Sequence, residues 1–166
     1  MSGPVKDPRA GALRQRYQEL FPGSAALPVP VESIAEDLLG LAVGEREDLE
    51  VSGMLVPAER QIWLNAAESP ARRRFTLAHE LGHWVCQHLE GRSVPVFCRA
   101  SEVGVGEGRL LEREANVFAA ELLMPEEDMR EAWSGITETA ARLHVSPLAM
   151  HWRAFSLGLT TERPSS

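Results

Sequence analysis

Hydrophobic residues recur every three or four positions along most of this chain, a spacing that predicts amphipathic helices. The clearest start signal is Ser69-Pro70, because a serine hydroxyl can cap free backbone N–H groups and proline fits the first helical turn. Gly40 is placed to end an earlier helix. The pattern predicts helices over residues 10–20, 31–39, 69–88, 110–123, 126–133, 137–143 and 147–157.

Two short apolar segments that contain β-branched residues predict strands. Residues 51–56 and 61–64 are separated by four residues that begin with a proline, which favours an antiparallel hairpin. Residues 41–43 could add a short strand, and residues 91–108, with four glycines, are expected to form a surface loop. The predicted fold class is α+β, mainly helical, with a small antiparallel β-sheet beside the 69–88 helix.

The length of 166 residues suits one compact domain with a small appended unit. We divide the chain into an N-terminal helix and linker (1–29), a core (30–133), and a helical C-terminal subdomain with its tail (134–166). The C-terminal pattern of a short helix, a tight turn at residues 144–146 and a second helix is similar to a helix-turn-helix.

Composition narrows the classes of function. Asp and Glu number 24 against 17 Lys and Arg, giving a net charge of −7, which is the opposite of a nucleic-acid-binding surface. The two cysteines, Cys86 and Cys98, are too few for a disulfide scaffold, and each is expected to be a small buried group. The charged N-terminus lacks the apolar core of a signal peptide, and no segment approaches the ~18 apolar residues of a membrane span. We expect a cytoplasmic protein that does not associate with membranes.

The helix predicted over residues 69–88 contains His79-Glu80-Leu81-Gly82-His83, an H-E-x-x-H motif. Positions four apart differ by only ~40° around a helix, so both imidazoles can face one metal ion. Neutral imidazole nitrogens suit zinc. Glu80 can then act as general base on a water molecule whose pKa zinc lowers from ~15.7 towards ~7. The alternative is a chance pentapeptide on an ordinary amphipathic helix, which the burial cost of two histidines and a carboxylate disfavours.

A catalytic zinc site needs a third protein ligand. Three residues on this helix or just beyond it are poor candidates for the third ligand. Glu90 lies ~10 Å from His83 along the helix axis, and His88 points ~180° away from His79. Cys86 is better explained as a buried structural thiol. The following helix offers Glu112, whose face otherwise carries small or apolar residues suited to close packing. Glu114 is the main alternative ligand, although it aligns with Glu121 on what the pattern indicates to be a solvent-facing edge.

Two blocks of this sequence resemble the ImmA/IrrE family of zinc metallopeptidases. The first, residues 73–83, reads RRFTLAHELGH, and the second, residues 112–125, reads EREANVFAAELLMP. The hairpin before the first block also fits, so the resemblance covers about residues 30–125. It implies a zincin-like core in which His79, His83 and Glu112 bind the metal and Glu80 is catalytic.

The resemblance further implies a zinc-dependent endopeptidase that cleaves a helix-turn-helix repressor, and so relieves repression after stress or in mobile-element control. Zinc is the expected metal, with manganese possible. A substrate could pair its backbone with the edge of the hairpin. The alternative function is a non-catalytic interaction or DNA-binding regulator with a structural metal.

The C-terminal subdomain is the basis of that alternative. Its second helix offers only Ser146, His151 and Arg153 as DNA contacts, and no lysine cluster accompanies them. DNA binding is therefore disfavoured. We expect a packing or protein-docking unit whose core contains Leu148, Trp152 and Phe155.

Overall fold

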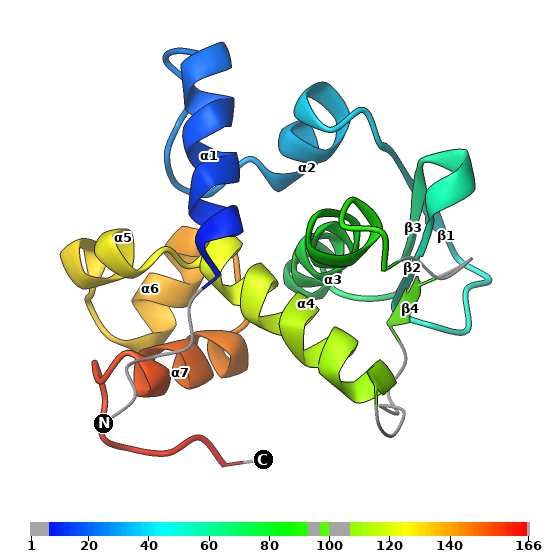
Figure 1. The fold of residues 1–166 in the computed structure, drawn as a ribbon. Coiled ribbons are helices and arrows are strands. Elements are labelled where there is room, and N and C mark those ends of the chain that lie inside the picture. Colours follow the sequence, from blue (N-terminus) through cyan, green and yellow to red (C-terminus); the bar gives the residue numbers. More distant parts are fainter. Residues whose placement is uncertain (1–6, 93–96, 100–106, 166) are drawn as a thin grey trace.

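The structure is a computed structural model that describes residues 7–92, 97–99 and 107–165. Helix α3 lies at the centre, with the sheet on one side of it and helices α5 to α7 on the other (Figure 1). None of the described helices is both long and apolar enough to cross a membrane. The helices are α1 (Pro8–Leu20), α2 (Val31–Ser33), α3 (Pro70–His83), α4 (Glu107–Leu123), α5 (Glu126–Ala132), α6 (Ile136–Leu143) and α7 (Pro147–Ser156), and the π-helices η1 (Ile34–Leu38) and η3 (Trp84–His88) extend α2 and α3.

Each helix predicted from the sequence is present, and local capping explains several of their ends. Asp7, Ser69 and Ser146 precede α1, α3 and α7, and each side chain accepts a hydrogen bond from a backbone N–H of the first turn. A proline follows each cap, where its missing N–H has no consequence. Gly40 has a φ of +66°, the left-handed conformation expected of a residue that ends a helix.

The predicted hairpin is present as strands β2 (Gly53–Val56) and β3 (Gln61–Asn65), which pair antiparallel. A short 3-10 turn, η2 (Pro57–Glu59), joins them together with Arg60, whose φ of 51° is left-handed. Alternate residues of β3 are buried, and Ile62 and Leu64 face the helices. This alternation is the one expected of a strand that buries a single face.

The sheet is mixed rather than wholly antiparallel, and it has four strands in the order β1-β3-β2-β4. Strand β1 (Ala42–Arg46) runs parallel to β3, because the chain reverses once between β1 and β2 and again at the hairpin turn. Strand β4 (Phe97–Arg99) lies within the expected surface loop and pairs antiparallel with β2, whose outer backbone groups it hydrogen-bonds. The loop expectation is wrong for these residues, while 93–96 and 100–106 lie outside the described residues.

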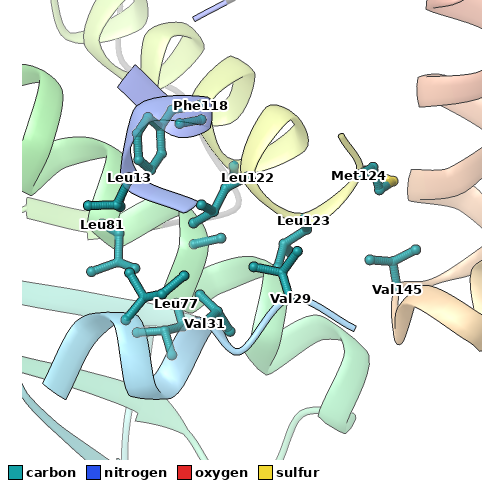
Figure 2. Close-up of a cluster of buried hydrophobic side chains, with 14 of the residues drawn as sticks. Leu13, Val29, Val31, Leu77, Leu81, Phe118, Leu122, Leu123, Met124 and Val145 are labelled. Atoms are coloured by element: carbon teal, nitrogen blue, oxygen red, sulfur yellow. The ribbon is translucent and has the colours of Figure 1, made fainter. Parts of the chain in front are cut away.

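The hydrophobic core forms where α3 meets α4, α1 and the chain before α2. Figure 2 shows Leu77 and Leu81 of α3 close to Phe118 and Leu122 of α4, with Leu13 of α1 beside them. All of these side chains are buried. Burying one such side chain stabilises a fold by about 1.5–3 kcal/mol, so this contact between α3 and α4 is a major source of stability.

Helices α3 and α4 approach each other at Gly82 and Ala115. A Cβ atom on Gly82 would lie 2.9 Å from Ala115 Cα and 3.0 Å from its carbonyl oxygen. The small residues of α4 were expected to permit a close approach, and Ala115 confirms this. No larger side chain fits at position 82 without moving one helix.

The expectation for the C-terminal subdomain is wrong in one respect. Helices α6 and α7 form the predicted pair, but Leu148, Trp152 and Phe155 are 53%, 41% and 37% exposed. The opposite face of α7 supplies the buried side chains, including Met150 and Ala154. The exposed residues are four and three positions apart, so they share one outward face of the helix.

Two arginines attach the subdomain to the core. Arg74 of α3 donates hydrogen bonds to the carbonyl oxygens of Leu143 and His144 at the end of α6. Arg153 of α7 is buried and donates to the carbonyl oxygen of Met124 at the end of α4. Both contacts satisfy carbonyl groups that helix ends leave without intrahelical partners.

Replacing Gly82 by valine should separate α3 from α4. We expect Gly82→Val to lower the free energy of unfolding by about 1–3 kcal/mol, the usual cost of overpacking. Urea unfolding in the presence of EDTA measures this without a contribution from metal binding. The matched control is Gly108→Val, because a Cβ at Gly108 meets nothing within 4 Å. Equal stability of the two variants would contradict the packing argument.

Candidate metal centre

The helical geometry of α3 brings two histidines of the H-E-x-x-H motif to one buried position. His79 and His83 lie one turn apart, and their Nε2 atoms are 3.1 Å from each other. Both side chains are almost fully buried where α3 crosses α4. A pair of imidazoles buried side by side requires partners that compensate for the lost hydration.

Glu112 of α4 completes the cluster. Its Oε2 lies 2.9 Å from His79 Nε2, and its Oε1 lies 3.0 Å from His83 Nε2. Among the described residues, these three side chains form the group of His, Cys, Asp and Glu that could hold a metal ion, with ligand atoms within 4.8 Å of one another. The structure thus brings together the three residues that the helical-face argument selected.

The charge of Glu112 suits a cation. Burial by itself raises the pKa of this carboxyl group, but hydrogen bonds with His79 and His83 outweigh burial and lower the pKa to about 2. Glu112 is therefore ionised at neutral pH, and each of its two carboxylate oxygens faces one of the Nε2 atoms.

Two amide side chains fix the orientation of the imidazoles. His79 Nδ1 donates to Asn116 Oδ1 at 2.8 Å, and His83 Nδ1 donates to Gln87 Oε1 at 2.6 Å. A neutral imidazole carries one N–H, so a proton held at Nδ1 leaves a lone pair on Nε2. Without a metal, a second proton on each Nε2 makes the hydrogen bond with Glu112. A metal ion would take the place of these protons and meet two Nε2 lone pairs, the arrangement that outer hydrogen bonds provide in metalloproteins.

Gln87 and Asn116 were not proposed as functional residues from the sequence, although their spacing carried a signal. Gln87 lies four residues after His83, and Asn116 lies four residues after Glu112, so each shares a helical face with a ligand candidate. Gln87 belongs to η3, the π-helix that begins directly after His83. Such π-turns inside helices are frequent at functional sites.

Glu114, the alternative ligand, lies outside the cluster. Its Oε1 accepts a hydrogen bond from Arg92 at 2.7 Å and is 3.5 Å from Gln87 Nε2. The expected solvent-facing edge is wrong for Glu121, which is buried and forms an ion pair with Arg153 at 3.3 Å. Neither carboxylate reaches the two motif histidines, and Glu114 instead supports Gln87.

Glu80 is fully buried beside the first histidine of the motif. It lies in the last turn of α3, directly after His79 in the sequence, where all residues from Thr76 to His83 are buried. Carboxyl groups are rarely buried without a specific role, because removing their charge from water is costly. A carboxylate next to a metal ligand can hold or transfer a proton during hydrolysis.

The other titratable residues of this region have separate structural roles. Glu90 is exposed and pairs with Arg9 at 2.6 Å, and the His88 ring stacks on Trp84. Cys86 is buried, as expected, and burial raises the pKa of its thiol, with Asp7 adding to the effect. The side chain of Cys98 lies outside the described residues.

The three residues considered for DNA contact are all engaged within the protein. Ser146 Oγ accepts from the Ala149 N–H and caps α7. His151 Nε2 is 2.9 Å from the carbonyl oxygen of Glu162, and Arg153 is buried. This surface of α7 therefore presents apolar side chains instead of the basic groups that bind phosphate.

A two-histidine, one-carboxylate cluster on crossed helices beside a small sheet is the architecture of H-E-x-x-H metalloproteins. The profile of the IrrE N-terminal-like domain matches residues 39–155. Because this match covers more than half of the chain, the chain belongs to that family, and the ImmA/IrrE resemblance is confirmed. Kinship with a metalloprotease implies a metal ion, and the His-His-Glu cluster is a possible site for it.

Two similar proteins extend the comparison. The chain is 34% identical over 114 residues to the radiation response metalloprotease IrrE of Deinococcus radiodurans, a match that spans 69% of this chain but 33% of the relative. The chain thus corresponds to about a third of that relative. Its fold is similar to that of a Mycobacterium tuberculosis transcriptional regulator, with a TM-score of 0.64 at 17% identity, over 88% of this chain and 46% of the other. This second likeness concerns the fold alone.

Removing the amide that orients His79 should weaken metal binding. We expect Asn116→Ala to reduce zinc affinity by about 10–100-fold, as losses of outer hydrogen bonds to metal-bound histidines usually do. Asn116→Asp should restore most of the affinity, because a carboxylate also accepts from Nδ1. Competition with a zinc chelator measures both variants, and unchanged affinity of Asn116→Ala would argue against the orienting role.

Proposed function

We propose that this chain is a zinc-dependent endopeptidase. The observation that carries the proposal is the convergence of His79, His83 and Glu112 on one point, with the buried Glu80 directly after His79 in the sequence. Family membership supports the same conclusion, since the relative in Deinococcus radiodurans is named a metalloprotease. Residues 30–133 would form the catalytic core and residues 134–166 a subdomain attached to it, with residues 1–29 packing as a helix and linker.

His79, His83 and Glu112 would hold the metal. Two imidazole nitrogens and one carboxylate are a common ligand set of catalytic zinc, and the set leaves a coordination position for substrate or water. When bound, zinc polarises the peptide carbonyl and makes water a better nucleophile. Manganese is the alternative metal, because imidazole and carboxylate ligands also accept it.

Glu80 would move the proton. Its carboxylate accepts a proton from the attacking water and afterwards gives it to the nitrogen of the leaving amine, which prevents the tetrahedral adduct from reverting. Burial next to His79 suits this role, because a carboxyl group shielded from bulk water exchanges its proton with the substrate. General acid–base catalysis of this kind contributes about 10²–10⁴-fold to the rate.

The substrate would be a protein, and the family resemblance points to a helix-turn-helix repressor. The name of the Deinococcus relative refers to a radiation response, which supports a role in relieving repression after stress. Such a repressor is a cytoplasmic protein, so we place the enzyme in the cytoplasm. The outward face of α7 carries Leu148, Trp152 and Phe155, and this apolar surface favours contact with protein over contact with DNA.

An extended substrate would pair with a strand edge other than the hairpin itself. Both hairpin strands already have neighbours on each side, because β3 lies between β1 and β2, and β2 lies between β3 and β4. Strand β4 is the sheet edge on the β2 side, and it contacts α3. Strand β1 is the other edge of the described sheet, and we favour β4 for the substrate segment because it lies against the helix that carries the motif.

Metal analysis distinguishes the two glutamates. We expect about one zinc per chain in the wild-type protein and in Glu114→Gln, and a large loss of zinc in Glu112→Gln, since an amide is a poor substitute for a charged ligand. Inductively coupled plasma mass spectrometry of purified protein measures the content. Retention of zinc by Glu112→Gln, or its loss only in Glu114→Gln, would refute the assignment.

Replacing Glu80 by glutamine tests the catalytic step. We expect Glu80→Gln to bind zinc as the wild-type protein does but to cleave at least about 10²-fold more slowly. The readout is a proteome-wide comparison of new protein N-termini in cells that express either form. Wild-type cells should contain cut helix-turn-helix repressors that are intact in cells with the variant. Identical cut ends in both would remove Glu80 from the mechanism.

A further inference from the structure

A groove of about 800 Å³ lies between α3, α4 and α7, outside the cluster of His79, His83 and Glu112. Its volume is in the upper part of the range of ligand-binding pockets, about 300–1,000 Å³. Most of its lining is apolar, and the side chains come from all three helices. The main apolar contributors are Phe75, Val117, Ala120, Leu148, Ala149 and Trp152.

The groove accounts for the exposed apolar residues of α7. Leu148 and Trp152 lie on its wall, and Phe155, which is also exposed, contacts the Trp152 ring edge-on. Side chains of this size on one helical face are normally covered by the core or by a partner. The fold attaches α7 firmly through Arg153, so this apolar wall is in place before any partner binds.

The groove is continuous with the proposed catalytic site. Asn116 lines the groove, and its Oδ1 accepts the hydrogen bond from His79. Phe75 precedes His79 by one helical turn, or ~5.4 Å, which an extended chain covers in about two residues at ~3.3 Å each. A polypeptide in the groove can therefore place a nearby peptide bond at the metal centre.

The charge of the groove differs from that of the chain. The protein carries a net charge of −7, yet the described residues that line the groove include three arginines and no acidic residue. Arg72 pairs with Glu68 and Arg153 with Glu121, while Arg113, next to Glu112 in the sequence, is exposed. Acidic side chains at the ends of an apolar segment would complement this lining.

We propose that this groove binds a segment of the protein substrate, close in sequence to the cleaved bond, that presents apolar side chains flanked by Asp or Glu. The proposal rests on the proposed function for the identity of its occupant. The groove then determines which proteins are cut, and it contributes to substrate affinity instead of to the chemical step. Leu148 and Trp152 are specificity-determining residues in this role.

The first test separates binding from cleavage. Zinc-loaded Glu80→Gln protein is used to select binders from a phage-displayed library of random 16-residue peptides. Selected peptides should combine apolar residues with Asp or Glu, and they should bind Leu148→Ser and Trp152→Ala versions about tenfold or more weakly. Leu20→Ser is the matched control, because Leu20 has a similar exposure of 57% but lies at the end of α1.

Hydrogen exchange on the Glu80→Gln protein provides a measurement that needs no groove variant. A selected peptide should slow exchange in α7 and in residues 113–120 of α4. Failure to select any peptide, equal binding by the groove variants, or protection elsewhere would overturn the proposal. A dimer in sedimentation experiments that Leu148→Ser dissociates would also overturn it, because a second copy would then occupy the groove.

Steady-state kinetics test whether the groove contributes to cleavage. The substrate is a protein that the comparison of new N-termini has identified. Leu148→Ser should raise KM about tenfold with little change in kcat and with normal zinc content. An unchanged KM would reject the groove and leave the peptidase proposal intact. If the wild-type protein cuts nothing while peptides still bind the groove, the peptidase proposal fails instead.

Discussion

The close contact between Gly82 and Ala115 sets the distance between α3 and α4, and the candidate metal centre depends on that distance. The two histidines lie on α3 and the third ligand candidate lies on α4, so a shift of one helix would separate Glu112 from both. The other side of α3 is equally constrained, because a Cβ on Gly53 of β2 would lie 2.4 Å from Thr76 Cγ2. A helix packed this closely on two sides holds its candidate ligands in place before a metal binds.

The sequence could predict features that depend on local geometry. The i, i+4 spacing of His79 and His83, the serine caps and the small face of the helix that carries Glu112 all follow from the 3.6-residue helical period. The parallel pairing of β1 with β3 and the addition of β4 depend on contacts between segments far apart in the chain. Neither has a periodic signal, and β4 is only three residues long.

Helix α7 shows a different limit of sequence reasoning. Apolar residues occur on two of its faces, one with Met150 and Ala154 and the other with Leu148 and Trp152. Periodicity identifies each face but does not indicate which one the core covers. In the structure, Arg153 fixes which face of α7 is buried. Its ion pair with Glu121 and its hydrogen bond to the carbonyl oxygen of Met124 direct the face with Met150 and Ala154 towards the core.

Asn116 connects the candidate metal centre with the groove beside α7. Its oxygen holds the ring of His79, while the residue also forms part of the groove wall. A substrate segment in the groove would lie against the Asn116 amide, which keeps His79 in its metal-binding orientation. The same side chain would then contribute both to substrate recognition and to the geometry of the metal centre. The second amide, Gln87, is supported by Glu114 and the backbone of Leu111, away from the groove. An amide side chain thus orients each histidine. Only the amide that orients His79, that of Asn116, would contact a substrate segment bound in the groove.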